Sequence, residues 1–500
     1  MVNWWYQRGT ASRRRQVACV ALALFVVVLL VLPRARTTVN PSGSSGGSTT
    51  NSDNAETTPL KLPGPPSHEV LRKWEEDLPQ HNLDLPFPEG RNGRYVKFSN
   101  QMVLVGWNNC LNERLMNAHL AYMSKRAYVF TEYIWDPSHY PWPPAQQPTD
   151  YARTPLNAIV SGPMAGGSWD PDDPAPRSIS ERWFDVVCPK ERRRLIHVRD
   201  VKPALADRPG DEVFAAWQKV LLEAEESCVE VVRPAWGEDD SMPQVFDLWL
   251  WGSNRVVPLW DVFKDSPTSR LLGPSPIVRS AIDRNEYLFV PRGPRPAHPA
   301  PRDVFARMLA IHLRRGDYIE HCKKLADWGS TFYSWAQLPQ VLDQFTPLPG
   351  DDPARLDTVL SHCLPTSAQI VKKIRDTREE YVKAGSGRVL DVLYLLTNEH
   401  GEWLDELKGE LAKAGWHTIV TTRDLKLDPE QEEVSMAVDM QFARQAAVFV
   451  GNGVRVSLFF ASFVLVLLLA LTTGQWSSFT GNIIHQRLVD GREPLSIRLT

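Results

Sequence analysis

The second half of the chain alternates short apolar runs with longer segments whose apolar residues recur at helical spacing. The predicted strands are Met308–Leu313, Val389–Leu396, Thr418–Thr421 and Ala447–Val450, and the predicted helices are Ser367–Ala384, Glu402–Ala414 and Glu432–Ala446. Such alternation is typical of an α/β fold with a parallel, doubly wound sheet. Ligands of these sheets bind at the carboxyl ends of the strands, where Arg314, Asn398 and Gly451 lie.

The first half shows a less regular pattern. Its predicted elements are a strand-turn-strand unit over Tyr95–Val105, helices over Leu111–Lys125 and Phe214–Glu226, and strands over Ala127–Phe130, Cys228–Val232 and Phe246–Trp251. Between the first strands and the first helix stands Gly106-Trp107-Asn108-Asn109, where backbone N–H groups and a positive helix end would favour an anion. The segment Pro137–Arg182 is predicted to be irregular. Pro274–Pro301 is predicted to be rich in loops and to link two domains.

The N-terminal region carries an unbroken apolar run, Val17–Leu32, directly after a basic segment that ends in Arg13–Arg15 and Gln16. The positive charge before the run predicts a signal anchor, with residues 1–16 in the cytosol and the rest of the chain in the lumen of the Golgi or the ER. A cleaved signal peptide is the alternative, because the run is short. Residues 33–90 are rich in Ser, Gly and Pro and are expected to form a flexible stem.

Composition narrows the chemistry. The chain has 56 Lys and Arg against 59 Asp and Glu, so no overall basic charge favours nucleic acid as a partner. Five cysteines lie beyond the apolar run, namely Cys110, Cys188, Cys228, Cys322 and Cys363. An oxidising lumen permits disulfides, and the odd number leaves at least one cysteine unpaired or paired with another chain. No Cys-x-x-Cys pair occurs, so a structural zinc site is not expected and no metal ligand is assigned.

The most informative stretch is Ile311-His312-Leu313-Arg314-Arg315-Gly316-Asp317-Tyr318, in which an apolar strand ends in two arginines, a glycine and an aspartate. Guanidinium groups present a planar fork of donors that stays charged, and glycine permits a tight turn, so the stretch suits a phosphate-like anion. A strand end that carries a surface salt bridge is the alternative for this motif taken alone.

Four motifs in order resemble those of the GDP-fucose protein O-fucosyltransferase family, and the chain is similar to a fungal-type member of it. The motifs are Gly106-Trp107-Asn108-Asn109, His312-Leu313-Arg314-Arg315-Gly316-Asp317, Thr397-Asn398-Glu399, and a C-terminal block made of Asp439, Ala447–Gly453 and Ser477-Ser478-Phe479-Thr480. Each motif is modest alone, but four of them in the same order are specific. The similarity extends from about Tyr95 to the C-terminus.

This resemblance implies a GT-B architecture, in which two Rossmann-like domains face a cleft. We expect an acceptor-side domain over residues 91–265 and a GDP-fucose-binding domain over residues 266–500. The implied reaction is an inverting, metal-independent transfer of fucose from GDP-fucose to Ser or Thr of a protein, with no cofactor. Arg314 is the expected catalytic residue, which would contact the β-phosphate and stabilise the negative charge that develops on the leaving GDP.

The resemblance also implies a set of binding residues. The expected ligand contacts are Gly106, Asn108, Asn109, His312, Arg314, Asp317, Asp439, Ser477, Ser478 and Phe479. His312 and Asp317 would shape the nucleotide site, and Ser478 and Phe479 would hold the phosphates or the base. Asp439 would lie near the guanine. An aspartate that only orients the neighbouring arginines is the simpler interpretation of Asp317.

The general base is not assigned from the sequence. Some family members place a glutamate just before the Gly-x-Asn turn, where this chain has Val105. Glu113 on the following helix is a possible substitute, although a solvated helix residue is the favoured interpretation. Asn108 and Asn109 would approach the sugar-phosphate from the first domain. Two other functions stay open: an α-fucosyltransferase that acts on a glycan, and a catalytically inactive sugar-nucleotide-binding or scaffold protein.

An apolar run, Val454–Gln475, splits the C-terminal block of the resemblance. Read at face value it is a membrane segment. We favour a translated, unspliced intron, because valine codons begin with GT, Gln475 can be encoded by CAG, and Leu471-Thr472 can encode a branch site. If the segment is present in the protein, it would separate Ser477-Ser478-Phe479 from Gly451 and abolish activity.

Overall fold

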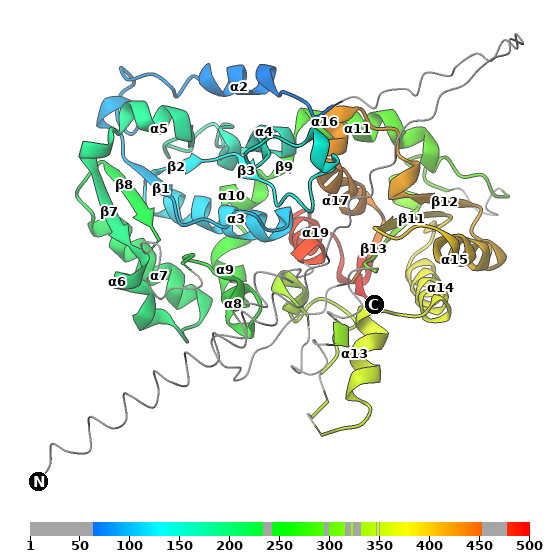
Figure 1. Ribbon diagram of the computed structural model, residues 1–500. Helices are drawn as coiled ribbons and strands as arrows, with labels where there is room; N and C mark the ends of the chain where they lie inside the picture. The colour runs from blue at the N-terminus through cyan, green and yellow to red at the C-terminus, as the bar shows by residue number, and fades with distance from the viewer. Residues whose placement is uncertain are drawn as a thin grey trace, which may run out of the picture. The chain divides into compact units, whose positions relative to one another are not determined.

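Two parallel sheets organise the computed structural model (Figure 1), which describes residues 64–233, 243–294, 300–315, 322–323, 332–346, 348–349, 351–452 and 478–500. The first sheet has the order β6-β2-β1-β8-β7, and the second has the order β12-β11-β10-β13-β14. Every pairing within these two sheets is parallel. The predicted α/β class with parallel sheets is therefore confirmed.

The strands fall into two groups along the chain. The first sheet consists of β1 Tyr95–Phe98, β2 Ala127–Phe130, β6 Ile179–Ser180, β7 Arg193–His197 and β8 Cys228–Val232. The second sheet consists of β10 Met308–Leu313, β11 Val392–Thr397, β12 Thr418–Thr421, β13 Val448–Gly451 and β14 Ile497–Leu499. Short antiparallel pairs join β3 Tyr133–Ile134 to β4 Arg153–Thr154, and β5 Val160–Ser161 to β9 Gly273–Pro274.

Helices surround both sheets. Those before residue 290 are α2 Glu69–Glu76, α3 Trp107–Met123, α4 Leu156–Ile159, α5 Glu181–Val187, α6 Val198–Val201, α7 Gly210–Glu223, α8 Leu248–Trp251, α9 Leu259–Phe263, α10 Pro267–Arg270 and α11 Pro276–Asn285. Those after it are α13 Arg355–Cys363, α14 Ser367–Lys383, α15 Glu402–Lys413, α16 Pro429–Glu433, α17 Ser435–Gln445 and α19 Ser478–Val489.

The core of the second sheet follows the period-2 alternation of side chains along a strand. In β10, Leu309, Ile311 and Leu313 pack with apolar residues of α14 and α15. Met308 and Ala310 point to the other face, where they join the cluster that contains residues of α17 and α19. The register pairs Leu313 with Thr397, so the residues that follow β10 and β11 emerge side by side.

Helix α3 lies between the first sheet and the second half of the chain. It packs against α7, α10 and α19, and all but its last two residues are buried. Figure 1 shows α3 and α19 meeting between the two sheets. Because both helices begin at this meeting point, their first turns bring residues from distant parts of the sequence together.

Several predicted elements match the structure at both ends. Strands β2, β8, β10 and β12 have the predicted bounds, and α14 and α15 end one residue earlier than predicted. The turn predicted before Leu111 is wrong in part, because helix α3 already begins at Trp107. The helix predicted over Glu432–Ala446 is interrupted at Val434 and forms α16 and α17.

Three other predictions are wrong. Phe246–Trp251 does not form a strand, because the Asp247 carboxylate accepts from the N–H of Leu250 and starts the short helix α8. The loop-rich Pro274–Pro301 contains α11, which Ser275 caps and Pro276 begins. The second strand expected before Val105 does not form, and only β1 is present in that unit.

The cysteine pairing is settled for the described residues. Cys188 pairs with Cys228, and Cys322 pairs with Cys363. Cys110 is the free thiol, and burial raises its pKa to about 12. A thiol that stays protonated is a poor nucleophile, so Cys110 is part of the core.

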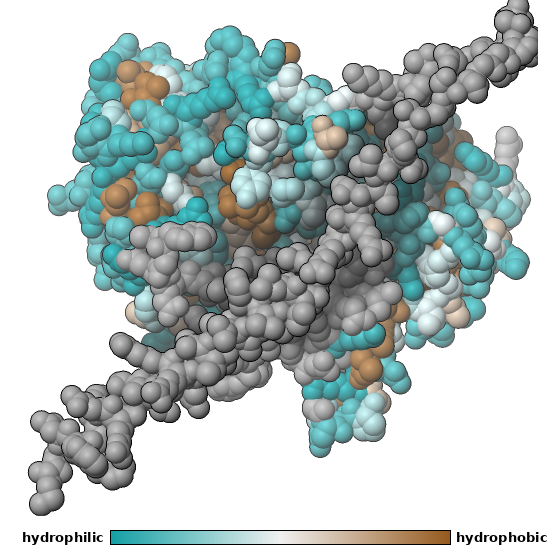
Figure 2. Space-filling model, viewed as in Figure 1, coloured by the Kyte–Doolittle hydropathy of each residue, from teal (hydrophilic) through white to brown (hydrophobic). Residues whose placement is uncertain are grey.

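The predicted anchor at Val17–Leu32, residues 33–63 of the stem, and Val454–Gln475 lie outside the described residues. A flexible stem is wrong for residues 64–90, which contain α2 and the buried His68 that bonds Glu433. Among the described helices, none has the length and apolar character needed to cross a membrane. On the face drawn in Figure 2, hydrophilic residues prevail over the described surface, and apolar residues form small, separate groups. Scattered exposed apolar residues are usual on a protein surface.

Candidate functional site

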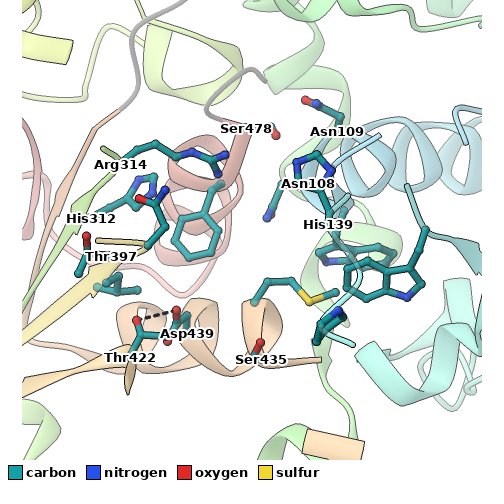
Figure 3. A pocket seen from close by; sticks show the side chains of 18 of the residues that line it. Asn108, Asn109, His139, His312, Arg314, Thr397, Thr422, Ser435, Asp439 and Ser478 are labelled. Carbon is teal, nitrogen blue, oxygen red and sulfur yellow. Dashed lines mark hydrogen bonds between the residues drawn. The ribbon is translucent and has the colours of Figure 1, made fainter. Parts of the chain in front are cut away.

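A cavity of about 340 Å³ lies where the carboxyl ends of β10 and β11 face the first turns of α3 and α19 (Figure 3). It brings together all the sequence-predicted contacts that the structure describes, which are Gly106, Asn108, Asn109, His312, Arg314, Asp439, Ser478 and Phe479. Asp317 and Ser477 lie outside the described residues. Residues far apart in the sequence thus line one cavity, while their individual roles stay predictions.

The arginine pair separates into two functions. The Arg314 side chain points into the cavity (Figure 3). The Arg315 guanidinium instead lies 4.1 Å from the centre of the Trp403 ring and donates to the carbonyl of Pro365 at 2.9 Å. The expectation that two guanidiniums meet one anion is therefore wrong for the described cavity, because Arg315 packs against α15.

Asn398 fixes the turn that presents Arg314. Its side-chain oxygen accepts from the N–H of Arg315 at 3.0 Å, and its amide donates to the carbonyl of Arg315 at 3.1 Å. A side-chain amide that hydrogen-bonds both the N–H and the carbonyl of one residue takes the place of the backbone of a neighbouring strand. This gives the Thr397-Asn398-Glu399 motif a structural role that the sequence did not suggest.

His312 is buried and held in one tautomer. The Thr480 hydroxyl donates to the carbonyl of Asn452 at 2.7 Å, so it accepts from Nδ1 of His312, which lies 3.1 Å away. Burial and the charge of Arg314 lower the pKa of His312 to about 3. The imidazole of His312 is therefore neutral at physiological pH. Its Nε2 carries no proton and is a hydrogen-bond acceptor.

The start of α3 presents donors to the cavity. Gly106 is the N-cap residue of the helix and makes no side-chain cap bond. Asn482 in α19 donates to the backbone oxygen and to Oδ1 of Asn108, at 2.9 and 3.1 Å. Because the Asn108 oxygen is engaged in this way, its NH₂ group remains for a ligand. A positive helix end and an amide donor favour an anion here.

The lower end of the cavity in Figure 3 carries a carboxyl group, Asp439. Its oxygens accept from the hydroxyls of Tyr394 and Thr422, the second at 2.9 Å. Burial raises the pKa of Asp439 to about 7. Each oxygen can still accept a further hydrogen bond, so this end suits a ligand with N–H donors, while the Arg314 end suits an anion.

The sequence did not predict the aromatic wall of the cavity. Ring centres lie 5.3 Å apart for Trp107 and Tyr133, and 4.9 Å apart for Tyr133 and Trp135. Tyr140 extends this cluster, with its ring edge-on to that of Trp135 and 5.5 Å between the ring centres. The only signal in the sequence is the aromatic density between residues 133 and 142, inside a segment predicted to be irregular.

Glu433 of α16 anchors this wall from behind. It accepts from His68 at 3.0 Å, from the Tyr140 hydroxyl at 3.1 Å and from the Thr154 hydroxyl. Thr154 in turn accepts from the indole N–H of Trp135 at 2.7 Å. A buried carboxylate from the second half of the chain therefore fixes aromatic residues of the first half.

Glu113 is neither solvated nor part of the cavity. Its exposed fraction is 0%, and it is not among the described residues that line the cavity. Its Oε2 accepts from the N–H of Met102 at 2.6 Å, and burial raises the pKa of Glu113 to about 8. The favoured interpretation as a solvated residue is wrong, and the alternative as a base in this cavity loses its geometric support.

Within the part of the chain that the structure describes, no three His, Cys, Asp or Glu side chains come together as metal ligands. No residue is therefore assigned to a metal.

No protein-family model matches the chain, and no similar sequence is found among curated proteins. Among solved structures it is similar to POFUT1 in complex with GDP-fucose, at 13% identity and a TM-score of 0.45, over 80% of this chain and 96% of that chain. The NodZ alpha-1,6-fucosyltransferase soaked with GDP-fucose has 12% identity and a TM-score of 0.33, over 72% of this chain and 88% of that chain. A variant of Arabidopsis thaliana FUT1 in complex with GDP has 12% identity and a TM-score of 0.30, over 77% of this chain and 70% of that chain. Values this low assign neither a fold family nor an activity to this chain.

A comparison of two glycine variants tests the cavity. A Cβ at Gly106 would meet no atom within 4 Å, whereas one at Gly451 would lie 2.3 Å from Cγ2 of Thr480. We expect Gly106→Ala to fold normally but to weaken GDP binding about tenfold, which corresponds to roughly 1.4 kcal/mol. Gly451→Ala displaces Thr480 and should lower stability by about 1–3 kcal/mol. Calorimetric titration and thermal unfolding measure both effects, and unchanged GDP binding by Gly106→Ala would place the anion elsewhere.

Glu113→Gln tests the buried carboxyl group. The raised pKa means that the folded chain keeps a proton that the unfolded chain releases above about pH 4.5. The wild type should therefore lose stability as the pH rises from about 4.5 to 8, by roughly 4 kcal/mol in all. Glutamine can still accept from Met102 and does not ionise, so the variant should lack this loss. Denaturant unfolding at several pH values measures this loss of stability, and Glu410→Gln at an exposed position is the control. Parallel curves of unfolding free energy against pH for Glu113→Gln and the wild type would contradict the prediction.

Deletion of residues 454–475 tests the intron hypothesis. The Thr480 hydroxyl lies 2.7 Å from the carbonyl oxygen of Asn452, so the described chain on both sides of the segment comes together. Three residues would then join Asn452 to Ser478, and four peptide units reach about 13–15 Å. We expect the shortened chain to fold, to be more soluble and to be the active form. An unfolded deletion variant, or transcripts that uniformly contain the segment, would refute the hypothesis.

Proposed function

We propose that the chain transfers fucose from GDP-fucose, which binds in the cavity between α3, α19 and the second sheet. The observation that carries the proposal is the convergence of motifs at one cavity, with Arg314 and the start of α3 at one end and Asp439 at the other. That polarity suits a diphosphate at the first end and the N–H edge of guanine at the second. No cofactor enters the proposal.

The proposed chemistry places Arg314 on the leaving group. An acceptor oxygen attacks C1 of fucose, the bond from C1 to the β-phosphate oxygen breaks, and its electron pair stays on GDP. The guanidinium of Arg314 stabilises the charge that develops on that phosphate, an effect worth about 3–4 kcal/mol for one well-placed donor. Asn398 and Arg315 hold the turn that carries Arg314, so the donor is positioned before the ligand arrives.

The finer assignment is a protein O-fucosyltransferase of GT-B architecture, with a domain boundary near residue 265. Four motifs support it: the family's strand-end motif at His312–Asp317, its N-terminal turn, its Thr-Asn-Glu strand end and its C-terminal block. A glycan acceptor is the second candidate, because the aromatic residues Trp135 and Tyr133 line the cavity, and aromatic rings favour the C–H side of a sugar ring. Incubation with GDP-fucose and either Ser/Thr peptides or free glycans distinguishes the two acceptors.

We also propose a luminal location behind an N-terminal anchor at residues 17–32, in the Golgi or the ER. The disulfides Cys188–Cys228 and Cys322–Cys363 support an oxidising compartment. Membrane extraction of the full chain, followed by protease protection, tests the topology. The fungal-type assignment stays a prediction.

Arg314→Ala tests the catalytic role. We expect GDP release from GDP-fucose to fall by about 100- to 1000-fold, because the charge on the leaving phosphate loses its donor. Arg314→Lys keeps the positive charge but loses the planar fork of donors, so its rate of GDP release should lie between those of the wild type and Arg314→Ala. Arg375→Ala on the exposed face of α14 is the control. The measurement uses the full chain and the chain without residues 454–475, and release unaffected by Arg314→Ala would remove Arg314 from this role.

A further inference from the structure

The wall of the cavity that faces Arg314 comes from the first half of the chain. Its lining residues are Trp107, Asn108, Asn109, Tyr133, Trp135, His139 and Pro141. Figure 3 shows His139 across the cavity from Arg314. In an inverting displacement, the nucleophile and the leaving group lie on opposite sides of the reacting carbon. With Arg314 on the leaving group, the attacking oxygen approaches from the wall that contains His139.

Few groups on this wall can take a proton from that oxygen. Amide groups such as those of Asn108 and Asn109 do not accept protons near neutral pH, and an indole is a donor only. The Tyr133 hydroxyl donates to the carbonyl of Val105 at 2.9 Å, and burial raises the pKa of Tyr133 far above its usual value. Among the described lining residues of this wall, the imidazole of His139 is the group suited to general base catalysis.

A carboxylate lies behind His139. Oδ1 of Asp136 is 4.0 Å from Nδ1 of His139. The backbone N–H and the hydroxyl of Ser138 donate to the same oxygen at 2.8 and 2.6 Å, and the N–H of His139 donates to the carbonyl of Asp136 at 3.0 Å. These bonds fix the turn, and the Asp136 carboxylate lies on the Nδ1 side of the imidazole, where it orients the ring.

We propose that His139 is the general base of the transfer and that Asp136 is a positioning residue for it. This inference rests on the proposed function and supplies the base that Val105 cannot provide. The acceptor O–H bond breaks and its proton goes to Nε2 of His139, while the oxygen forms a bond to C1. The bond from C1 to the phosphate oxygen breaks at the same time, its electron pair leaves with GDP, and His139 later gives the proton to solvent.

The test measures GDP release from GDP-fucose with two nucleophiles. It uses both the complete chain and the chain from which residues 454–475 are deleted. Water needs a base to become a good nucleophile, whereas azide carries no proton to lose. We expect His139→Ala to lower GDP release with water by about 100-fold, and azide to restore release to within a few-fold of the wild type. GDP-fucose binding should be unchanged. Asp136→Asn should give a smaller loss, and His400→Ala, an exposed histidine, should give none.

The outcomes distinguish the role of His139 from the proposed fucose transfer on which it rests. Equal losses with water and azide, or release within twofold of wild type by His139→Ala, would overturn the role of His139 and leave the proposed function intact. Failure of the wild type to bind GDP-fucose would overturn the proposed function and this inference with it. Wild-type binding of GDP-fucose without GDP release by either nucleophile would overturn both the proposed transfer and the role of His139, and would leave only GDP-fucose binding. Because the His139 side chain is 35% exposed on a loop, loss of folding is not the expected cause of any change.

Discussion

The cavity depends on the two hydrogen bonds made by the hydroxyl of Thr480. This hydroxyl donates to the carbonyl of Asn452 at the end of β13 and accepts from His312 at the end of β10. A hydroxyl has one proton to give, so this pair of bonds sets the tautomer of His312 as well as the position of α19. Gly451 leaves the room that the Thr480 side chain occupies. Two strand ends, a histidine tautomer and a helix start are therefore determined together.

The two halves of the chain meet through polar contacts as well as apolar ones. Asn482, two residues after Thr480, reaches Asn108 at the start of α3, and Glu433 bonds His68, Tyr140 and Thr154. Hydrogen bonds are directional, so they fix how the two walls of the cavity face each other. A buried polar group that loses its partner costs about 1–3 kcal/mol, which penalises other arrangements of these residues. These contacts therefore favour one arrangement of the two walls of the cavity.

Sequence patterns were sufficient to predict an element where the local hydrophobic pattern agrees with the packing in the folded protein. The strand Met308–Leu313 is apolar except at His312 and is buried on both faces, so its bounds and the site at its end could be predicted. Phe246–Trp251 has a similar apolar pattern, yet the Asp247 carboxylate caps a helix there. The burial of Glu113 and the aromatic wall around Trp135 depend on contacts with residues far away in the sequence. No local pattern encodes such contacts.

The separation of Arg314 from Arg315 was within reach of the sequence, through alternation. Leu309, Ile311 and Leu313 point toward α14 and α15, and the same period carries Arg315 to Trp403 on that side. His312 and Arg314 occupy the alternate positions and reach the cavity. One more or one fewer residue in β10 would exchange the two arginines between the cavity and α15. The bonds from Asn398 to the backbone of Arg315 hold this register just where the strand ends and the period would otherwise be lost.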